Sequence, residues 1–278
     1  MAENSKIEWC DHTFNAWVGC QKVGPACDFC YAETWAKRSG MVEWGPGEDR
    51  RRTSAKNWAE PLKWNAKAAA AGRIATVFSL SLGDIWDPEA DPLWRWDLFA
   101  LIENTPSLLW LLLSKRIGNA VKMCDPLKGC RVLPRNTALG ATMVTQEEWD
   151  RDAPKLEETK HRLGPLFTFA SVEPMLGQID PSLHTPDWII CGGESGGHAR
   201  PMHPAWARAL RDHCVAAGVP FLFKQWGEWA PGHPDVLADM RSVHRFGDGA
   251  RVGRFGKAIA GRELDGRTWD QMPEARRG

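Results

Sequence analysis

Residues 73–84, RIATVFSLSLGD, open with a short apolar run and end in polar residues and glycine. The same pattern returns five more times along the chain, at 107–116, 136–144, 166–174, 187–197 and 219–226. Short, continuous apolar runs of this kind are typical of strands that are buried on both faces, as in a parallel sheet. The sequence therefore predicts about six parallel strands.

Segments with helical character lie between the predicted strands, at 91–104, 117–124, 146–163 and 204–218, and a further one at 61–72 precedes the first strand. Pro204 suits a first helical turn and Gly218 a helix stop, whereas Pro154 is expected to break the third helix. Strand and helix alternate without an internal repeat or a low-complexity linker. This alternation predicts an α/β fold, either barrel-like or open.

The composition is that of a globular protein. The chain has 278 residues, 43% of them apolar, and its 35 basic residues balance its 35 acidic ones, so no overall positive charge favours a polyanionic partner. Neither a signal peptide nor a run of ~20 apolar residues is present, which predicts a cytoplasmic protein that does not bind membranes. Eight cysteines in such a chain favour metal binding or catalysis over disulfides.

Polar residues follow nearly every predicted strand. In βα folds, binding and catalysis concentrate at the carboxyl ends of the strands. Here those ends carry Ser81, Gly83 and Asp84; Ser114, Lys115 and Arg116; Thr142; Ser171 and Glu173; Gly192, Gly193, Glu194 and Ser195; and Lys224, Gln225 and Trp226. Any one of them has the alternative explanation of a loop start or helix cap. Together they predict the wall of a polar site.

Three cysteines lie within eleven residues in GCQKVGPACDFCYAE, residues 19–33. A structural zinc site requires four ligands, and either Cys10 or His12 is available as the fourth. Thiolates at close spacing also hold iron–sulfur clusters, with glycine and proline helping the chain to wrap the cluster. The spacing of Cys20, Cys27 and Cys30 leaves both metal sites open.

The residue before the last cysteine adds a resemblance. Three cysteines with an aromatic residue directly before the third resemble the radical SAM enzymes, and Phe29 occupies that place. The resemblance implies that Cys20, Cys27 and Cys30 hold a [4Fe–4S] cluster. Its open iron would bind S-adenosylmethionine, whose cleavage yields a 5′-deoxyadenosyl radical. The sequence departs from the commonest pattern of that superfamily, because six residues rather than three separate the first two cysteines.

The chain as a whole resembles a phage-associated family of unassigned proteins with radical-SAM-like cysteines. The motifs that carry this resemblance are IEWCDHTFNAWVGCQKVGPACDFCYAE, SLSLGDIW, LLSKR, SVEPMLG, CGGESGGHARPMHPAWARALRDHC, GVPFLFKQWG and GRELDGRTWDQMP. Relatives are similar to the radical SAM isomerases of phage thymidine hypermodification. The resemblance implies a partial (βα) barrel of the radical SAM type that rearranges an amino-acid-decorated thymine in phage DNA, in the host cytoplasm. A lyase of the spore photoproduct lyase type and a non-catalytic, zinc-stabilised nucleic-acid-binding module are the alternatives.

The resemblance also implies roles for individual residues. Phe29 is expected to pack near the adenine of S-adenosylmethionine, Ser81 and Asp84 to bind its methionine amine, and Glu173 or Thr142 to hydrogen-bond its ribose. In the stretch GGESGG, the backbone at Gly192 and Gly193 would approach the cofactor and Glu194 or Ser195 would contact it, unless the stretch is simply a tight turn. Lys115, Arg116 and Lys224 are the candidate catalytic residues.

Two basic stretches are candidates for binding DNA. Residues 241–262 interleave arginines and Lys257 with aromatic residues and glycines, a composition that suits phosphates and bases, and Arg251, Arg254 and Lys257 are the expected contacts. Arg50, Arg51 and Arg52 form a second stretch. Solvated surface charge is the alternative for both.

We expect a single domain over residues 1–278, with the cluster loop at 19–33 and a basic, glycine-rich extension at about 227–278. Its expected partners are DNA carrying a modified base and a reducing electron donor such as flavodoxin.

Overall fold

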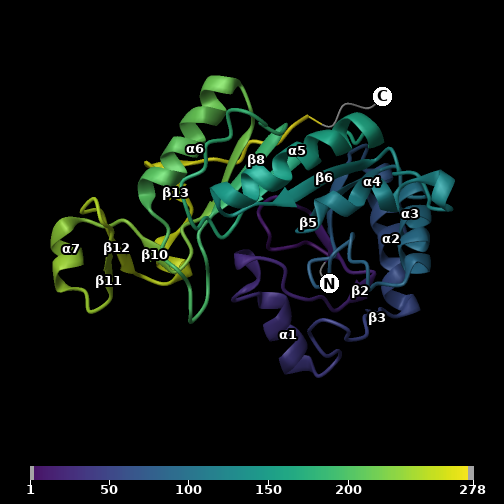
Figure 1. Ribbon diagram of the computed structural model, residues 1–278, viewed down its shortest axis with the longest axis horizontal. Helices are drawn as coiled ribbons and strands as arrows, with labels where there is room; N and C mark the ends of the chain where they lie inside the picture. Colours follow the sequence, from purple (N-terminus) through teal and green to yellow (C-terminus); the bar gives the residue numbers. More distant parts are fainter. Residues whose placement is uncertain (1–2, 275–278) are drawn as a thin grey trace. The chain divides into compact units, whose positions relative to one another are not determined.

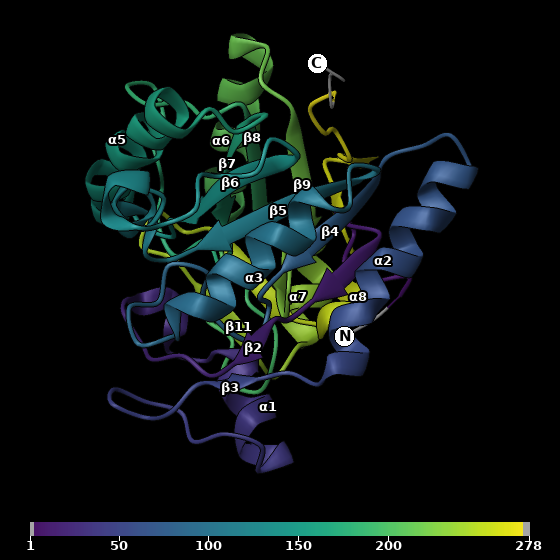
Figure 2. The same ribbon diagram turned by 90° about the vertical axis from the view of Figure 1, so that its right-hand side faces the viewer.

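The computed structural model describes residues 3–274, and seven of its strands form a parallel sheet within an α/β fold (Figures 1 and 2). The seven strands are β1 His12–Phe14, β4 Ala75–Ser79, β5 Leu108–Ser114, β6 Thr137–Thr142, β7 Thr168–Val172, β8 Trp188–Gly192 and β9 Phe221–Gln225. They are ordered β1-β4-β5-β6-β7-β8-β9. Each of the six predicted strands is present, and β1 adds a seventh at the edge next to β4. The predicted α/β fold with a partial barrel of parallel strands is confirmed.

The first strand, β1, is absent from the sequence prediction. It pairs in parallel with β4, with His12 opposite Val77 and Phe14 opposite Ser79. Its three residues, HTF, are too few and too mixed in polarity to give a periodic signal. The segment is recognised as a strand only through its pairing with β4 in the folded chain.

The chain forms two compact units. The first unit comprises the residues up to Ala141 together with Pro154–Phe169, and the second comprises Thr142–Ala153 and Ala170–Pro273. Each unit has its own buried apolar residues, such as Val77 and Trp110 in the first and Ile189 in the second. The organisation as a single domain stays a prediction.

The first unit surrounds its strands with helices and short turns. These are the helices α1 Tyr31–Ser39, α2 Ala55–Ala70, α3 Pro92–Glu103 and α4 Ala120–Met123, the 3-10 turns η1 Pro25–Cys27, η2 Ile117–Asn119 and η3 Pro126–Lys128, and the two-residue strands β2 Trp17–Val18 and β3 Arg51–Arg52. Helix α2 packs against β4 and β5 (Figure 2). It begins six residues earlier than expected because the Ser54 side chain accepts a hydrogen bond from the Asn57 amide and caps the helix.

Helix α5, Gln146–Leu163, corrects one expectation, because it continues through Pro154. A proline inside a helix removes one backbone hydrogen bond and favours a break. Trp149 and Leu156 are both 2% exposed and lie seven residues apart on one face of the helix. Burial of that face holds the helix together across the proline, since tertiary packing supplies most helical stability in proteins.

The second unit contains α6 Pro204–Ala217 and the C-terminal elements α7 Pro234–Asp239, α8 Lys257–Ala260, β10 Trp229–Ala230, β11 Val243–Arg245, β12 Arg251–Arg254, β13 Glu263–Leu264 and β14 Arg267–Thr268. Helix α6 packs against β8 and β9 (Figure 1). As predicted, it starts at Pro204 and stops at Gly218, which adopts a left-handed conformation with φ 66°. The C-terminal strands form a small antiparallel sheet, β10-β12-β11, and the hairpin β13-β14.

No helix among residues 3–274 is both long enough and apolar enough to cross a membrane.

Gly140 in β6 provides a test of the packing in the first unit. A Cβ at this position would lie 2.4 Å from the ring of Phe169, which is completely buried and has no room to turn away. Gly140→Ala should therefore lower the free energy of unfolding by about 1–3 kcal/mol. The measurement is urea denaturation followed by tryptophan fluorescence. Gly177→Ala is the matched control, because no atom lies within 4 Å of its added Cβ. Equal midpoints for the two variants would contradict this packing.

Candidate functional site

The segment that follows β4 folds back onto the start of the chain. Asn15 fixes it, since its Oδ1 accepts a hydrogen bond from the Leu82 amide at 2.7 Å and its Nδ2 donates to Ser81 Oγ at 3.1 Å. Gly83 passes the indole of Trp17 so closely that a Cβ would lie 3.2 Å from the indole nitrogen. The strand-end residues Ser81 and Asp84 are thereby held on a short, tightly packed segment.

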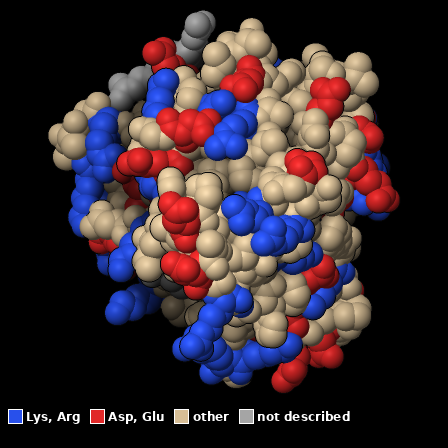
Figure 3. Space-filling model, turned by 90° about the vertical axis from the view of Figure 1, so that its left-hand side faces the viewer, with Lys and Arg blue, Asp and Glu red and all other residues tan. Residues whose placement is uncertain are grey.

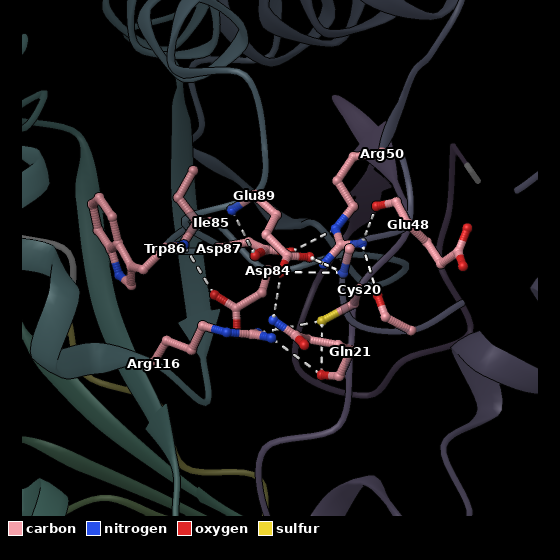
Figure 4. A network of polar contacts seen from close by, with 12 residues as sticks. Cys20, Gln21, Glu48, Arg50, Asp84, Ile85, Trp86, Asp87, Glu89 and Arg116 are labelled. Atoms are coloured by element: carbon pink, nitrogen blue, oxygen red, sulfur yellow. Dashed lines mark hydrogen bonds and ion pairs between the residues drawn. The ribbon is translucent and has the colours of Figure 1, made fainter. Parts of the chain in front are cut away.

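Asp84 is the centre of a polar network that joins the ends of β4 and β5 (Figure 4). Its Oδ1 accepts hydrogen bonds from Ser114 Oγ at 2.6 Å and from the Trp86 amide at 2.9 Å. Its Oδ2 accepts one from the Lys115 amide at 3.0 Å and lies 3.2 Å from Arg116 Nη1. The carboxylate is buried and has four donors, so it organises this strand end. Its expected contact with a methionine amine stays a prediction.

Arg116 links this carboxylate to the first cysteine of the loop. Its Nη1 lies 3.3 Å from Cys20 Sγ, and its Nη2 donates to the carbonyl oxygen of Gln21 at 3.1 Å. Burial raises the pKa of the Cys20 thiol to about 11 and the Asp84 carboxylate adds to the rise, whereas the guanidinium opposes it. Burial lowers the pKa of Arg116, but Asp84 and Cys20 outweigh that effect and raise it above its ordinary value.

Backbone contacts hold the start of the cysteine loop from other directions. The carbonyl oxygen of Cys20 accepts a hydrogen bond from the Gly45 amide at 3.2 Å, and the Gly19 amide donates to the Leu82 carbonyl at 3.0 Å. The side chain of Gln21 donates to Glu89 Oε1 at 3.2 Å. Cys20 is therefore anchored both through its side chain and through the backbone around it.

Arg50 belongs to the interior of the first unit. Its Nε lies 2.8 Å from Asp87 Oδ2 and its Nη2 2.6 Å from Glu89 Oε2, and its side chain is 1% exposed. Its Nη1 donates to the carbonyl oxygens of Gly45 and Glu48. These contacts correct the expectation that Arg50 binds DNA, because a buried guanidinium with this set of acceptors is not available to a phosphate.

The three loop cysteines match an iron–sulfur ligand set in kind and number. All eight cysteines are free thiols. Cys27 ends η1 and is buried, Cys30 directly precedes α1 and is half-buried, and Phe29 between them is 45% exposed. Within residues 3–274, however, no three Cys, His, Asp or Glu side chains are gathered closely enough to hold a metal ion. Within residues 3–274, the loop thus carries suitable donors that are not arranged as a closed site.

The residues considered as a fourth metal ligand have other surroundings. The ring of His12 stacks on Trp64 with 4.5 Å between ring centroids, and its Nδ1 accepts a hydrogen bond from the Asn4 amide. Cys10 is buried. In the described part of the chain neither residue completes a metal-binding group with the loop cysteines.

A second polar cluster lies at the ends of β8 and β9 in the second unit. Lys224 Nζ lies 2.7 Å from Glu173 Oε1 and 3.0 Å from Oε2. Gln225 Nε2 contacts Glu173 Oε1 at 3.2 Å and Ser195 Oγ at 3.0 Å. The structure therefore brings together Glu173, Ser195, Lys224 and Gln225, which the sequence places among the polar strand ends, and Gln225 connects Glu173 to Ser195. Thr142, the last residue of β6, is buried.

The GGESGG stretch is shaped by packing within the second unit. A Cβ on Gly193 would lie 1.9 Å from the Trp226 carbonyl oxygen, so this glycine is required for a close backbone approach. A Cβ on Gly192 would lie 3.4 Å from the Glu173 side chain, an ordinary contact distance. Glu194 forms a bidentate ion pair with Arg200, with contacts of 2.7 and 2.8 Å. These contacts give Gly193 and Glu194 structural roles. The Ser195 hydroxyl, in contrast, accepts a hydrogen bond from Gln225 Nε2 in the polar cluster.

The remaining basic candidates differ in how their side chains are engaged. Arg51 is exposed and donates to the Met41 carbonyl, and Arg52 pairs with Asp97 and lies over the Trp58 ring. Arg254 donates to the carbonyl oxygens of Gly196 and Gly197. Arg251 is half-buried in β12 and Lys257 is exposed at the start of α8. Among these candidates, Arg51, Arg251 and Lys257 have the side chains with the fewest contacts of this kind to the rest of the protein.

Sequence reasoning missed Asn15, Glu89 and Arg200 as organising residues of these two clusters. Each acts by contacting a segment remote in sequence or a loop carbonyl or carboxylate. An isolated asparagine, glutamate or arginine in a loop gives no periodic or spacing signal. No feature of the sequence would have singled them out.

The Arg50 network gives a second prediction. Arg50→Gln leaves the completely buried Asp87 without its cation, and removing one partner of a buried pair costs about 3–5 kcal/mol. Urea denaturation should show a loss of that size in the free energy of unfolding. Arg51→Gln is the control. Arg51 is the next residue along the chain and its side chain is exposed, so its replacement should change the free energy of unfolding by less than about 0.5 kcal/mol. A small effect at both positions would show that Arg50 is not the interior residue described above.

Comparisons with known proteins place the chain in a family. Two solved structures of spore photoproduct lyase are similar to it. One, a double mutant with bound AdoMet and dinucleoside spore photoproduct, is 11% identical with a TM-score of 0.48, covering 90% of this chain and 70% of that one. The other, complexed with dinucleoside spore photoproduct, is 12% identical with a TM-score of 0.47, covering 92% and 72%.

No curated protein matched the chain. The family model described as "Protein of unknown function (DUF5131)" matches residues 4–273. Because this match spans nearly the whole sequence, the chain belongs to the DUF5131 family of proteins of unknown function.

Proposed function

We propose that the protein is a radical SAM enzyme and that Cys20, Cys27 and Cys30 are the ligands of its [4Fe–4S] cluster. The observation that carries the proposal is the attachment of the cysteine loop to the ends of two parallel strands, through the contact between Arg116 and Cys20 Sγ at 3.3 Å. Chemistry in folds of this class is concentrated at that end of the strands. Three free thiols on one short loop supply the donor set. When bound, the cluster would supply an iron for S-adenosylmethionine and the electron for its cleavage, delivered by a donor such as flavodoxin.

The protein's own residues are assigned separately in each unit. In the first unit, the ring of Phe29, which is 45% exposed and directly precedes Cys30, is proposed to stack on an adenine. In the second unit, Ser195 and Glu173, which Gln225 connects, are proposed to contact ligand hydroxyls. Lys224, which is paired with Glu173, is the proposed proton-carrying group of that cluster.

As substrate we propose a modified thymine base in DNA, which the enzyme rearranges. A base inside a duplex has to leave the stack before an enzyme can react with it, and phosphate contacts offset part of that cost. Basic and acidic side chains are interspersed on the face shown in Figure 3, so such contacts would be local rather than part of a uniformly positive surface. Arg251, Lys257 and Arg51 are proposed for them. A lyase that acts on a DNA lesion is the alternative, and mass analysis of nucleosides after anaerobic incubation with modified DNA distinguishes the products.

The cluster ligands are tested by anaerobic reconstitution with iron and sulfide. Cys20→Ala, Cys27→Ala and Cys30→Ala should each abolish incorporation of the cluster, because an iron that lacks one thiolate is not retained. The measurements are iron and sulfide content together with the visible absorption of the protein. Wild-type protein should in addition cleave S-adenosylmethionine when reduced.

Alanine variants of the other cysteines are the controls. Replacement of Cys10, Cys124, Cys130, Cys191 or Cys214 should leave the iron content unchanged. A requirement for Cys10 would instead indicate a four-cysteine site. A colourless wild-type protein that retains zinc would favour the non-catalytic nucleic-acid-binding module.

The DNA contacts are tested with the double variant Arg251→Gln, Lys257→Gln. Arg254 is left in place because its guanidinium holds the carbonyl groups of Gly196 and Gly197. Loss of two phosphate contacts should weaken binding about equally for all sequences and reduce the slope of log K against log salt by about 2. Fluorescence anisotropy with a labelled duplex at several salt concentrations measures both quantities.

A second double variant, Lys128→Gln with Arg162→Gln, removes the same charge elsewhere and should bind as wild type does. Equal losses in the two double variants would show a general charge effect. Absence of salt-dependent binding by the wild-type protein would exclude a polymeric DNA substrate.

A further inference from the structure

We infer that Arg116 is a positioning residue that fixes the Cys20 thiol relative to the ends of β4 and β5, as one member of the set of three thiols that binds metal. This inference rests on the proposed metal-binding role of the three cysteines and assigns a part of that role to a residue that is not itself a ligand. Arg116 is one of the candidate catalytic residues of the sequence analysis, and its contacts with Cys20 and Gln21 favour a positioning role.

The guanidinium of Arg116 contacts the cysteine loop at two points. One nitrogen, Nη1, faces the sulfur of Cys20 at 3.3 Å, and the other, Nη2, donates to the next carbonyl oxygen along the loop, that of Gln21, at 3.1 Å. The planar fork of an arginine thus holds a side chain and the adjoining backbone at the same time. A lysine, with a single nitrogen on a flexible stem, would not reproduce this double contact.

Arg116 is itself held in place. Its side chain is 8% exposed and its Nη1 lies 3.2 Å from Asp84 Oδ2. The Arg116 amide also donates to Ser114 Oγ at 2.8 Å, and that hydroxyl donates to Asp84. A buried guanidinium requires a counter-charge, and Asp84 supplies it while being tied to the ends of both β4 and β5. The Cys20 side chain is therefore held, through Arg116 and Asp84, by the ends of β4 and β5.

The arrangement of the other two cysteines shows what remains to be fixed. The hydrogen bond from Arg116 reaches the sulfur of Cys20, and within residues 3–274 the three sulfurs are not gathered into a metal-binding group. The segment that carries Cys27 and Cys30 is joined to the strand end through Tyr31, whose hydroxyl donates to the Ser81 carbonyl oxygen at 2.6 Å, and internally through Lys22, which donates to the Asp28 carbonyl and pairs with Glu33. A three-thiolate site requires the sulfurs to come closer together, and Arg116 fixes the place of Cys20 in that set.

The test is a titration of the metal-free, full-length protein with Co²⁺ under anaerobic conditions. The thiolate-to-cobalt charge-transfer absorbance reports how many cysteines bind, and its concentration dependence gives the affinity. Cys20→Ser defines the signal of a site that lacks this thiolate. Arg116→Gln should give a charge-transfer intensity close to that of Cys20→Ser and bind Co²⁺ about 10- to 100-fold more weakly than wild type, as loss of an outer residue that orients a ligand does.

Two further variants separate positioning from folding. Arg116→Lys keeps a positive charge beside Asp84 but loses the double contact, so its affinity should fall between those of wild type and Arg116→Gln. Asp84→Asn should weaken Co²⁺ binding in the same direction, because the guanidinium loses its anchor. Arg131→Gln removes an arginine–carboxylate pair with Glu103 elsewhere in the first unit and should bind Co²⁺ as wild type does. Circular dichroism of each variant checks that the fold is intact.

The outcomes distinguish this inference from the proposed function. If wild type binds Co²⁺ with a three-thiolate spectrum and Arg116→Gln retains both intensity and affinity, the positioning role is overturned and the cluster ligands stand. The same holds if Arg116→Gln fails to fold and both Arg116→Lys and Asp84→Asn bind as wild type does. If wild type shows no thiolate-to-cobalt absorbance and takes up no iron, the proposed function fails and the positioning role with it.

Discussion

The carboxylate of Asp84 is the interaction on which the candidate site of the first unit depends. A buried carboxylate is costly unless donors surround it, and this one has a hydroxyl, two amides and a guanidinium within 3.2 Å. Those donors come from the last residue of β5 and from the segments that follow β4 and β5. Satisfying one charge therefore fixes two strand ends relative to each other and places Arg116 beside Cys20.

A second ion network reinforces the same region. Arg50 is paired with Asp87 and Glu89, and Glu89 also accepts a hydrogen bond from Gln21 in the cysteine loop. The acidic residues of the stretch GDIWDPE, residues 83–89, thus face two arginines that lie far from them in sequence. Acidic residues that would ordinarily be solvated are used here to hold irregular backbone. In this way the first residues of the cysteine loop, which lie outside any helix or strand, are held in place by Glu89 and Arg116.

The second unit shows how close backbone packing and a polar cluster occur in one motif. Gly193 is constrained by the carbonyl oxygen of Trp226, whereas Ser195, two residues later, contacts Gln225. A glycine-rich stretch after a strand is therefore not in itself evidence of a ligand. The distinction lies in which neighbour occupies the space that a Cβ would fill.

Strands β4 to β9 and helices α2 to α6 could be predicted because their signal is local. A short, continuous apolar run such as LLWLLLS in β5 favours a buried strand, and Pro204 and Gly218 mark the ends of α6 through their own backbone preferences. Pro154 shows the limit of this reasoning. Its local preference for a helix break is overridden by burial of Trp149 and Leu156 on the same helix.

Three features follow from the amino-acid pattern alone: the alternation of strands and helices, the polar character of the strand ends, and the three thiols on one loop. The partners of these residues are set by the folded chain. Asp84 and Arg116 are 32 positions apart and meet because β4 and β5 pair in parallel with Ser79 opposite Leu112, which brings the residues beyond both strands to one edge. Likewise, nothing in the run Arg50, Arg51, Arg52 shows that the first arginine turns inward to Asp87. Pairings of this kind depend on register and burial, which are properties of the folded chain and not of any local pattern.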